Sequence, residues 1–158
     1  MILEIFADDL TKNDINKNMF RSSRAIIKNK DQVLLLYSKA LDYYMLPGGR
    51  IEKGESPKEC VVREVIEETG LTVNVLHQSL TIKEYYLDSS WESYFFVCEL
   101  EDVLIKNQCL TDEEKDLNIE MIWMPYLDAI QLLDEYDSKF SKAINIMQRE
   151  FLALTHSF

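Results

Sequence analysis

Three glutamates crowd one side of a helix that the sequence predicts over Pro57–Thr69. An N-cap serine, a proline at the first helical position and a glutamate three residues after the cap begin this helix, and Gly70 ends it. At 3.6 residues per turn, Glu64, Glu67 and Glu68 fall within an arc of roughly 100°. Carboxylates at these spacings repel one another, and the last two also oppose the helix dipole.

A hard divalent cation would remove this conflict, because Mg²⁺ and Mn²⁺ prefer carboxylate and carbonyl oxygens together with water and substrate phosphate. The ordinary alternative is a solvated acidic face in an unrelated α/β protein, since most acidic helix faces have no other role. The residues that precede the helix favour the metal.

The 23 residues from Gly49 to Leu71 resemble the Nudix box. That pattern reads glycine, five residues, glutamate, seven residues, and then Arg-Glu-apolar-any-Glu-Glu-any-Gly-apolar. Each fixed position is matched here, by Gly49, Glu55, Arg63, Glu64, Val65, Glu67, Glu68, Gly70 and Leu71.

The resemblance implies a Nudix-type α/β/α sandwich with a mixed β-sheet. It also implies a hydrolase, dependent on Mg²⁺ or Mn²⁺, that cleaves a phosphoanhydride bond in a nucleoside diphosphate linked to another moiety. The implied metal ligands are Glu64, Glu67, Glu68 and the carbonyl of Gly48.

Four further residues of the box are implied to support the site. An ion pair between Glu55 and Arg63 would lock the loop onto the helix, where it would orient the ligands. A surface ion pair of little energetic value is the alternative. Gly49 and Gly70 belong to the same supporting set.

Hydrolysis by water also needs a group that takes the proton. Glu67 and Glu68 belong to the catalytic set, but the base is expected from the acidic segment beyond the box. Glu114 ranks first there, ahead of Glu113, Asp116 and Glu120. Each of these acids has the alternative of being a solvated loop residue, in which case Glu52 or Glu67 would be the base.

Two arginines are candidates for binding phosphate, because a guanidinium makes two-point contacts with oxyanions. Arg50 is adjacent to the box glycines, and Arg24 lies in a predicted strand.

Apolar alternation and turn residues predict the elements that position this motif. Helices are predicted over Tyr126–Glu135 and Ser138–Leu154, and a polar loop over Asp102–Asp116. Strands are predicted over Ile2–Phe6, Ser22–Lys28, Gln32–Tyr37, Tyr43–Leu46, Leu71–Leu76, Leu80–Leu87, Ser93–Leu100 and Ile119–Met124.

The length of 158 residues predicts a single domain over residues 1–158. The net charge of −11 argues against nucleic acid polymers and anionic membranes as partners. Three cysteines without metal-ligand spacing, and a start without a basic segment before its apolar residues, predict a cytoplasmic protein.

The expected partner is a small, phosphorylated, nucleotide-type substrate, and the chain is expected to be a monomer or a homodimer. The substrate itself is left open: a nucleotide sugar, a nucleoside triphosphate or a related compound. The alternative function is a catalytically silent Nudix module that binds a nucleotide as a sensor.

Overall fold

A computed structural model describes residues 1–7, 10–11, 18–101, 109–140 and 142–158 of the chain. Helices are α1 (Pro57–Thr69), α2 (Asp112–Asp116), α3 (Tyr126–Glu135) and α4 (Ala143–Thr155). Strands are β1 (Ile2–Phe6), β2 (Met19–Asn29), β3 (Gln32–Ser38), β4 (Tyr43–Met45), β5 (Gly48–Arg50), β6 (Val73–Tyr85), β7 (Ser90–Leu100) and β8 (Ile119–Pro125). None of the helices in these residues is long and apolar enough to cross a membrane.

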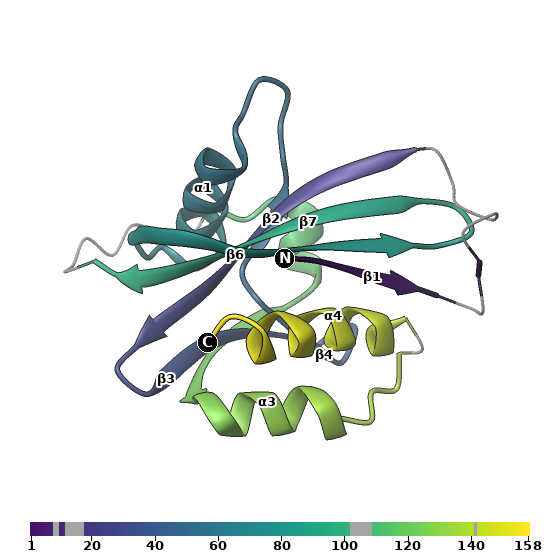
Figure 1. Cartoon of the computed structure of the whole chain (residues 1–158). Coiled ribbons are helices and arrows are strands. Elements are labelled where there is room, and N and C mark those ends of the chain that lie inside the picture. Colours follow the sequence, from purple (N-terminus) through teal and green to yellow (C-terminus); the bar gives the residue numbers. More distant parts are fainter. Residues whose placement is uncertain (8–9, 12–17, 102–108, 141) are drawn as a thin grey trace.

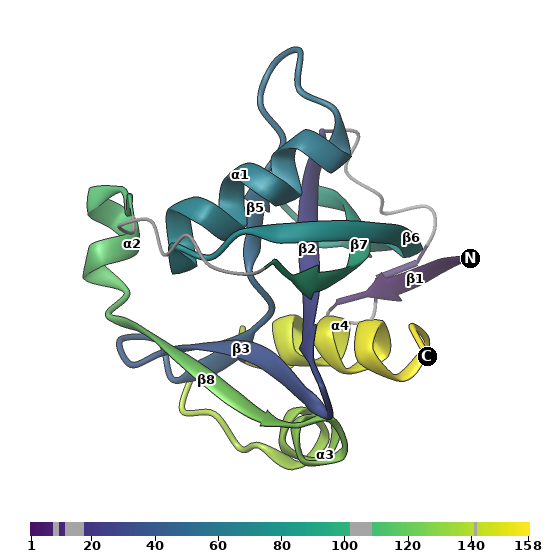
Figure 2. The ribbon, with the colours of Figure 1, turned by 90° about the vertical axis from the view of Figure 1, so that its left-hand side faces the viewer.

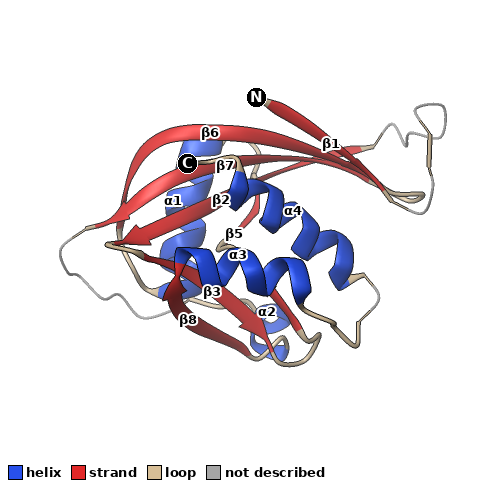
Figure 3. Cartoon of the chain, turned by 60° about the horizontal axis from the view of Figure 1, so that its bottom comes forward, coloured by secondary structure: helices blue, strands red, loops and turns tan. Residues whose placement is uncertain are grey.

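The strands form one eight-stranded mixed sheet in the order β1-β6-β7-β2-β3-β4, with β5 paired to β2 and β8 paired to β3. The pairs β1–β6 and β2–β7 are parallel, and the other pairs are antiparallel. Helix α1 covers one face of the sheet, and α3 and α4 lie side by side on the other (Figures 1 and 3). The predicted α/β/α sandwich with a mixed sheet is thereby confirmed.

Strand β2 contributes to both cores because its side chains alternate between the two faces. Ala25 and Ile27 pack under α1 with Val61 and Val65. Ile26 faces the other way, into the larger core that α3 and α4 cover. Strand β2, in the middle of the sheet, therefore packs against both helical layers.

Strand β2 changes its partner along its length, which places the Leu46–Gly48 segment beside it (Figure 2). It pairs with β5 at Ser22–Arg24 and with β3 only at Lys28 and Asn29. Between these two pairings, the Ala25 amide donates to the Pro47 carbonyl at 2.8 Å. The glycines that begin the Nudix-like motif are thus fixed to a central strand.

Several predicted boundaries were wrong, and two of the differences have a clear physical cause. One long strand, β6, replaces the two strands predicted over Leu71–Leu76 and Leu80–Leu87, because β-bulges absorb the irregular alternation between them. Helix α4 begins at Ala143 and not at Ser138, because the Asp42 carboxylate accepts the Lys139 amide at 2.9 Å and holds that stretch out of the helix.

The predicted polar loop over Asp102–Asp116 lies partly outside the described residues. Its last part, Asp112–Asp116, is the short helix α2. A capping box begins this helix: the Thr111 hydroxyl accepts the Glu114 amide at 3.2 Å, and the Glu114 carboxylate accepts the Thr111 amide at 2.6 Å. Two backbone amides at the helix start are thereby satisfied.

Candidate active site

Helix α1 is capped at both ends as the sequence predicts. The Ser56 hydroxyl accepts the Glu59 amide at 3.2 Å, and the Glu59 carboxylate accepts the Ser56 amide at 2.8 Å. Gly70 has φ of 73°, a left-handed conformation that suits glycine, and its amide donates to the Ile66 carbonyl at 2.9 Å. These caps fix where the helix starts and ends, and with that the direction of its glutamates.

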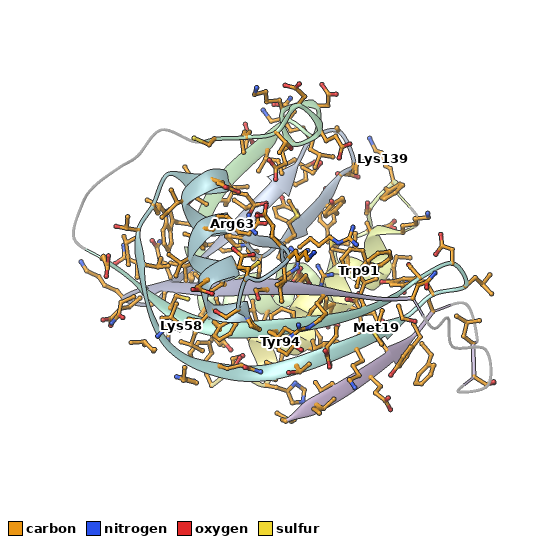
Figure 4. All side chains as sticks on the ribbon, turned by 90° about the horizontal axis from the view of Figure 1, so that it is seen from above. Met19, Lys58, Arg63, Trp91, Tyr94 and Lys139 are labelled. Carbon is orange, nitrogen blue, oxygen red and sulfur yellow. The ribbon has the colours of Figure 1, made fainter. Side chains whose placement is uncertain are left out.

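Arg63, labelled in Figure 4, joins α1 to the loop before it. Its Nε and Nη2 donate to the two Glu55 carboxylate oxygens at 2.8 and 2.9 Å, so the expected ion pair is present. Its Nη1 donates to Glu64 at 2.8 Å and to Glu67 at 3.0 Å. The Arg63 guanidinium holds the pKa of Glu55 at about 2, and the same bonds raise the pKa of Arg63.

Glu64 packs directly against the Gly49 backbone. A Cβ atom at Gly49 would lie 2.4–2.6 Å from the Glu64 carboxylate atoms, closer than any side chain tolerates. Glu64 is 6% exposed, and burial raises the pKa of its carboxyl. A side chain at position 49 would therefore displace the Glu64 carboxylate, which occupies the space where that side chain would begin.

The loop before α1 also holds Glu68. The Gly48 amide donates to its carboxylate at 2.8 Å, and burial raises the pKa of Glu68 to about 8. Gly48 itself has φ of 148°, and a Cβ there would lie 2.1 Å from the Ser23 carbonyl oxygen. The tight approach of this loop to β2 therefore depends on a glycine.

The second helix of the site brings a third carboxylate to this pair. Ligand atoms of Glu64, Glu68 and Glu114 all lie within 4.8 Å of one another, although Glu114 comes from α2. Three carboxylates at this separation, two of them buried, form the donor set that a hard divalent cation requires. The fourth candidate, Glu67, lies outside this trio and bonds Arg63.

A pocket of about 670 Å³ opens beside the cluster. Its walls come from the loop, α1 and the segment around α2, and are formed by Gly49, Arg50, Ile51, Glu52, Lys53, Arg63, Glu64, Glu67, Thr111, Glu113, Glu114 and Leu117. The cavity has the size of a ligand site, and most of the residues that line it are polar or charged.

The two candidate arginines differ in their surroundings. Arg50 lines the pocket, and its guanidinium lies 4.2 Å from the centre of the Phe20 ring. Arg24 lies behind the loop, where its Nη1 donates to the carbonyls of Leu46 and Gly48 at 3.1 and 3.4 Å.

The other acids beyond the box have separate positions. Glu113 lines the pocket, whereas Glu120 forms an ion pair with Lys39 on the edge formed by β3 and β8. Among the four acids that the sequence offered beyond the box, Glu114 is the one that joins Glu64 and Glu68 within the described residues.

Sequence reasoning missed a buried ion network on α4. Arg149 and Glu150 are 7% and 0% exposed, and Arg149 donates to Glu84 of β6 at 3.3 Å. Charged residues in an amphipathic helix read as its solvated face, so no sequence signal marked these two. The capping box of α2, in contrast, could have been found from Thr111 and Glu114, which stand three residues apart before an apolar strand.

Comparison with known proteins decides the family. The profile of the NUDIX domain matches residues 19–144, which include all of α1, its loop and α2. The chain belongs to the Nudix family. Strand β1 and most of α4 lie outside the matched range of the Nudix domain.

Curated Nudix relatives differ in what their names say they act on. An ADP-ribose pyrophosphatase of Bacillus subtilis is 24% identical over 93% of this chain and 85% of its own length. Diphosphoinositol polyphosphate phosphohydrolase 3-alpha of Mus musculus is 34% identical over 72% of this chain and 64% of its own. An 8-oxo-dGTP diphosphatase of Escherichia coli is 42% identical over 30% of this chain.

Several of these matches are partial. The chain spans 26% of a putative nudix hydrolase 1 of Caenorhabditis elegans and 40% of the Escherichia coli protein. Solved structures share the fold over longer stretches. A NUDIX hydrolase from Nitrosomonas europaea has a TM-score of 0.65 at 17% identity, covering 89% of this chain and 93% of that one. A UDP-X diphosphatase has a TM-score of 0.62 at 20% identity, covering 94% and 67%.

Proposed function

We propose that this Nudix domain is a divalent-metal-dependent hydrolase that cleaves a phosphoanhydride bond in a nucleoside diphosphate linked to another moiety. The observation that carries the proposal is the meeting of Glu64, Glu68 and Glu114 within 4.8 Å at the edge of a pocket. Helices α1 and α2, which are far apart in sequence, bring their carboxylate oxygens close together there.

Glu64 and Glu68 would hold Mg²⁺ or Mn²⁺. The two further expected ligands, Glu67 and the Gly48 carbonyl, accept hydrogen bonds from Arg63 and Arg24 in this structure, so each would have to exchange that bond for the cation. When bound, the cation supplies positive charge that neutralises the phosphate oxygens of the substrate and lowers the pKa of water. The fit rests on the donors themselves: burial raises the pKa of both Glu64 and Glu68, and a hard cation would favour their charged forms.

Glu114 would take the proton from the attacking water. Its carboxylate accepts the Thr111 amide at 2.6 Å, so the capping of α2 also fixes the direction of this side chain. A base must come within hydrogen-bond reach of the water it activates, and the position of Glu114 beside Glu64 and Glu68 satisfies this need for a water bound there.

Arg50 is proposed to bind phosphate from the wall of the pocket, because a guanidinium suits two-point contact with an oxyanion. The substrate class is a small phosphorylated compound of nucleotide type. The excess of 11 negative charges on the chain disfavours nucleic acid polymers.

A panel of substrates tests the proposal. The chain is incubated with 8-oxo-dGTP, ADP-ribose, a UDP-sugar and a diphosphoinositol polyphosphate in Mg²⁺ or Mn²⁺, and the phosphorylated products are measured with and without EDTA. We expect turnover of at least one compound, and loss of that turnover in EDTA and in Glu68→Gln. Glu59→Gln is the matched control on the same helix, because glutamine also completes a capping box.

Full turnover in EDTA, after verified removal of metal, would refute the metal mechanism. Tight binding of a nucleotide without hydrolysis of any compound would instead support the alternative, a Nudix module that acts as a sensor.

A further inference from the structure

We propose that Arg24 is a positioning residue, which holds the Leu46–Gly48 segment so that Gly48 meets Glu68, and that Glu150 of α4 anchors Arg24 for this task. The proposal deepens the proposed function and rests on it, because Glu68 belongs to the proposed metal site. It assigns to Arg24 an action through the loop and not a contact with phosphate.

The first observation is the way β2 binds this loop. The Arg24 Nη1 donates to the Leu46 and Gly48 carbonyls at 3.1 and 3.4 Å. The Ala25 amide donates to the Pro47 carbonyl at 2.8 Å. Three consecutive carbonyls of the loop therefore accept hydrogen bonds from two adjacent residues of one strand, and this fixes the direction of the Pro47–Gly48 peptide.

The second observation is the use that the site makes of this peptide. The Gly48 amide donates to the Glu68 carboxylate at 2.8 Å, and the Pro47 carbonyl of the same peptide unit accepts the Ala25 amide at 2.8 Å. A rotation of the peptide would move both groups together, because the peptide unit is planar. Arg24 bonds the carbonyls of the two flanking peptide units, those of Leu46 and Gly48, and so limits this rotation. The orientation of Glu68 therefore depends on Arg24 through the Pro47–Gly48 peptide.

The third observation is the anchor of Arg24. Its Nε lies 3.9 Å from the Glu150 carboxylate, which is fully buried. Glu150 in turn accepts a hydrogen bond from Arg149, and Arg149 donates to Glu84 at 3.3 Å. A chain of buried charges thus runs from β6, through α4, to the loop of the active site. The Tyr86 hydroxyl donates to the other carboxylate oxygen of Glu84 at 2.8 Å.

Stability alone is a weak reason for such a chain. Replacing buried ion pairs by apolar residues of similar size is often neutral or stabilising. Burial and the neighbouring charge of Arg149 lower the pKa of Arg24, and Glu150, Glu68 and Glu84 offset this only in part. What arginine offers here is a rigid planar group whose Nη1 bonds the loop carbonyls while its Nε lies at ion-pair distance, 3.9 Å, from Glu150.

The test compares Arg24→Lys with Arg21→Lys, a matched control on the same strand. The Arg21 guanidinium is half exposed and bonds Tyr94 on the α1 side of the sheet, and within the described residues it makes no hydrogen bond to Leu46, Pro47 or Gly48. Lysine keeps the charge in both variants but replaces the planar fork by a single ammonium group. The three readouts are amide hydrogen exchange at Gly48, the affinity for Mn²⁺, and kcat and KM on a substrate from the panel.

For Arg24→Lys we expect exchange at Gly48 to accelerate at least about tenfold relative to the Ile26 amide of β2, which serves as an internal reference. We expect Mn²⁺ binding to weaken about tenfold and kcat to fall at least about tenfold, with KM within about threefold of the wild type. Arg21→Lys should change none of the three. If Arg24→Lys does not fold, Glu150→Gln carries the test, with changes in the same direction at Gly48.

Two results would overturn the proposal. One is exchange at Gly48 that is unchanged in both Arg24→Lys and Glu150→Gln. The other is a rise of KM with kcat unchanged, which would place Arg24 on the substrate. If the wild type neither binds Mn²⁺ nor hydrolyses any compound, the proposed function fails, and the exchange at Gly48 still decides whether Arg24 holds the loop.

Discussion

The amide of Gly48 donates a 2.8 Å hydrogen bond to the carboxylate of Glu68, which lies 20 residues further along the chain. This bond joins the residue just before the Nudix motif to the last glutamate of its helix, so that the loop and the helix are fixed to each other. Burial nevertheless dominates the electrostatics of Glu68 and raises its pKa to about 8.

The first prediction concerns the stability of the metal-free protein. Below about pH 4.5, the ordinary pKa of glutamate, Glu68 is protonated in both the folded and the unfolded chain, so its burial does not lower the free energy of unfolding through a charge. As pH rises toward about 8, the unfolded chain releases this proton while the folded chain retains it, so the free energy of unfolding falls. Glu68→Gln should remove this loss.

Urea unfolding in EDTA, from pH 4 to pH 9, measures this effect. The wild type and Glu68→Gln should diverge as pH rises, with the variant the more stable at alkaline pH, even though its kcat with metal falls at least about tenfold. Parallel stability curves for the two proteins would show that the Glu68 carboxyl titrates normally.

The second prediction concerns the ion pair of Glu55 and Arg63. Glu55→Gln and Arg63→Ala should be non-additive in stability and in activity, because two hydrogen bonds of 2.8 and 2.9 Å join these side chains. Chemical denaturation and kinetics on the two single variants and the double variant measure the coupling. Strictly additive losses would mean that the pair does not hold the loop on the helix.

The third prediction uses the close packing of Gly49 on Glu64. Gly49→Ala should displace the Glu64 carboxylate, because the new Cβ would lie 2.4 Å from its nearest oxygen. We expect Mn²⁺ to bind about tenfold more weakly, which corresponds to about 1.4 kcal/mol, and isothermal titration calorimetry measures this change.

Gly54→Ala is the matched control for that variant. A Cβ at Gly54 would meet nothing within 4 Å, but φ is +86°, so alanine there adds only backbone strain of about 1–2 kcal/mol. Mn²⁺ affinity should be unchanged. Equal losses of affinity in both variants would point to general loosening of the loop and not to the carboxylate.

The fourth prediction concerns the proposed base. Glu114→Gln should lower kcat strongly, leave KM within a few fold and remove the acidic limb of the pH–rate profile. Glutamine keeps the capping of α2, so the melting temperature should change little. If Glu114→Gln is silent while glutamine at Glu113 or Glu120 is not, the base is another acid of the same segment.

The sequence predicted the helix of the site and its caps because those signals are local. Ser56, Pro57, Glu59 and Gly70 act on backbone groups within one turn of themselves, so their types and spacing determine the result. The glutamate face follows from the helix period. Hydrophobic alternation and turn-forming residues likewise predicted most strands, although the bulges in β6 interrupt its alternation and made one strand look like two.

The remaining features depend on contacts between distant segments. The Asp42 carboxylate accepts the amide of Lys139, 97 residues away, and keeps the stretch before Ala143 out of α4. No local sequence pattern marks this contact. The role of Arg24 likewise depends on α4, whose Glu150 reads in sequence as one of many surface acids. Pairings of this kind become visible only when the sheet and its two helical layers are assembled.

The central claim is that carboxylates of the Nudix helix hold a catalytic divalent cation. Electron paramagnetic resonance of Mn²⁺ titrated into the protein measures this binding directly, in the wild type, in Glu64→Gln and in the control Glu59→Gln. The account predicts saturable binding in the wild type and the control, and an affinity at least about tenfold lower in Glu64→Gln. Equal Mn²⁺ affinity in all three proteins would contradict it.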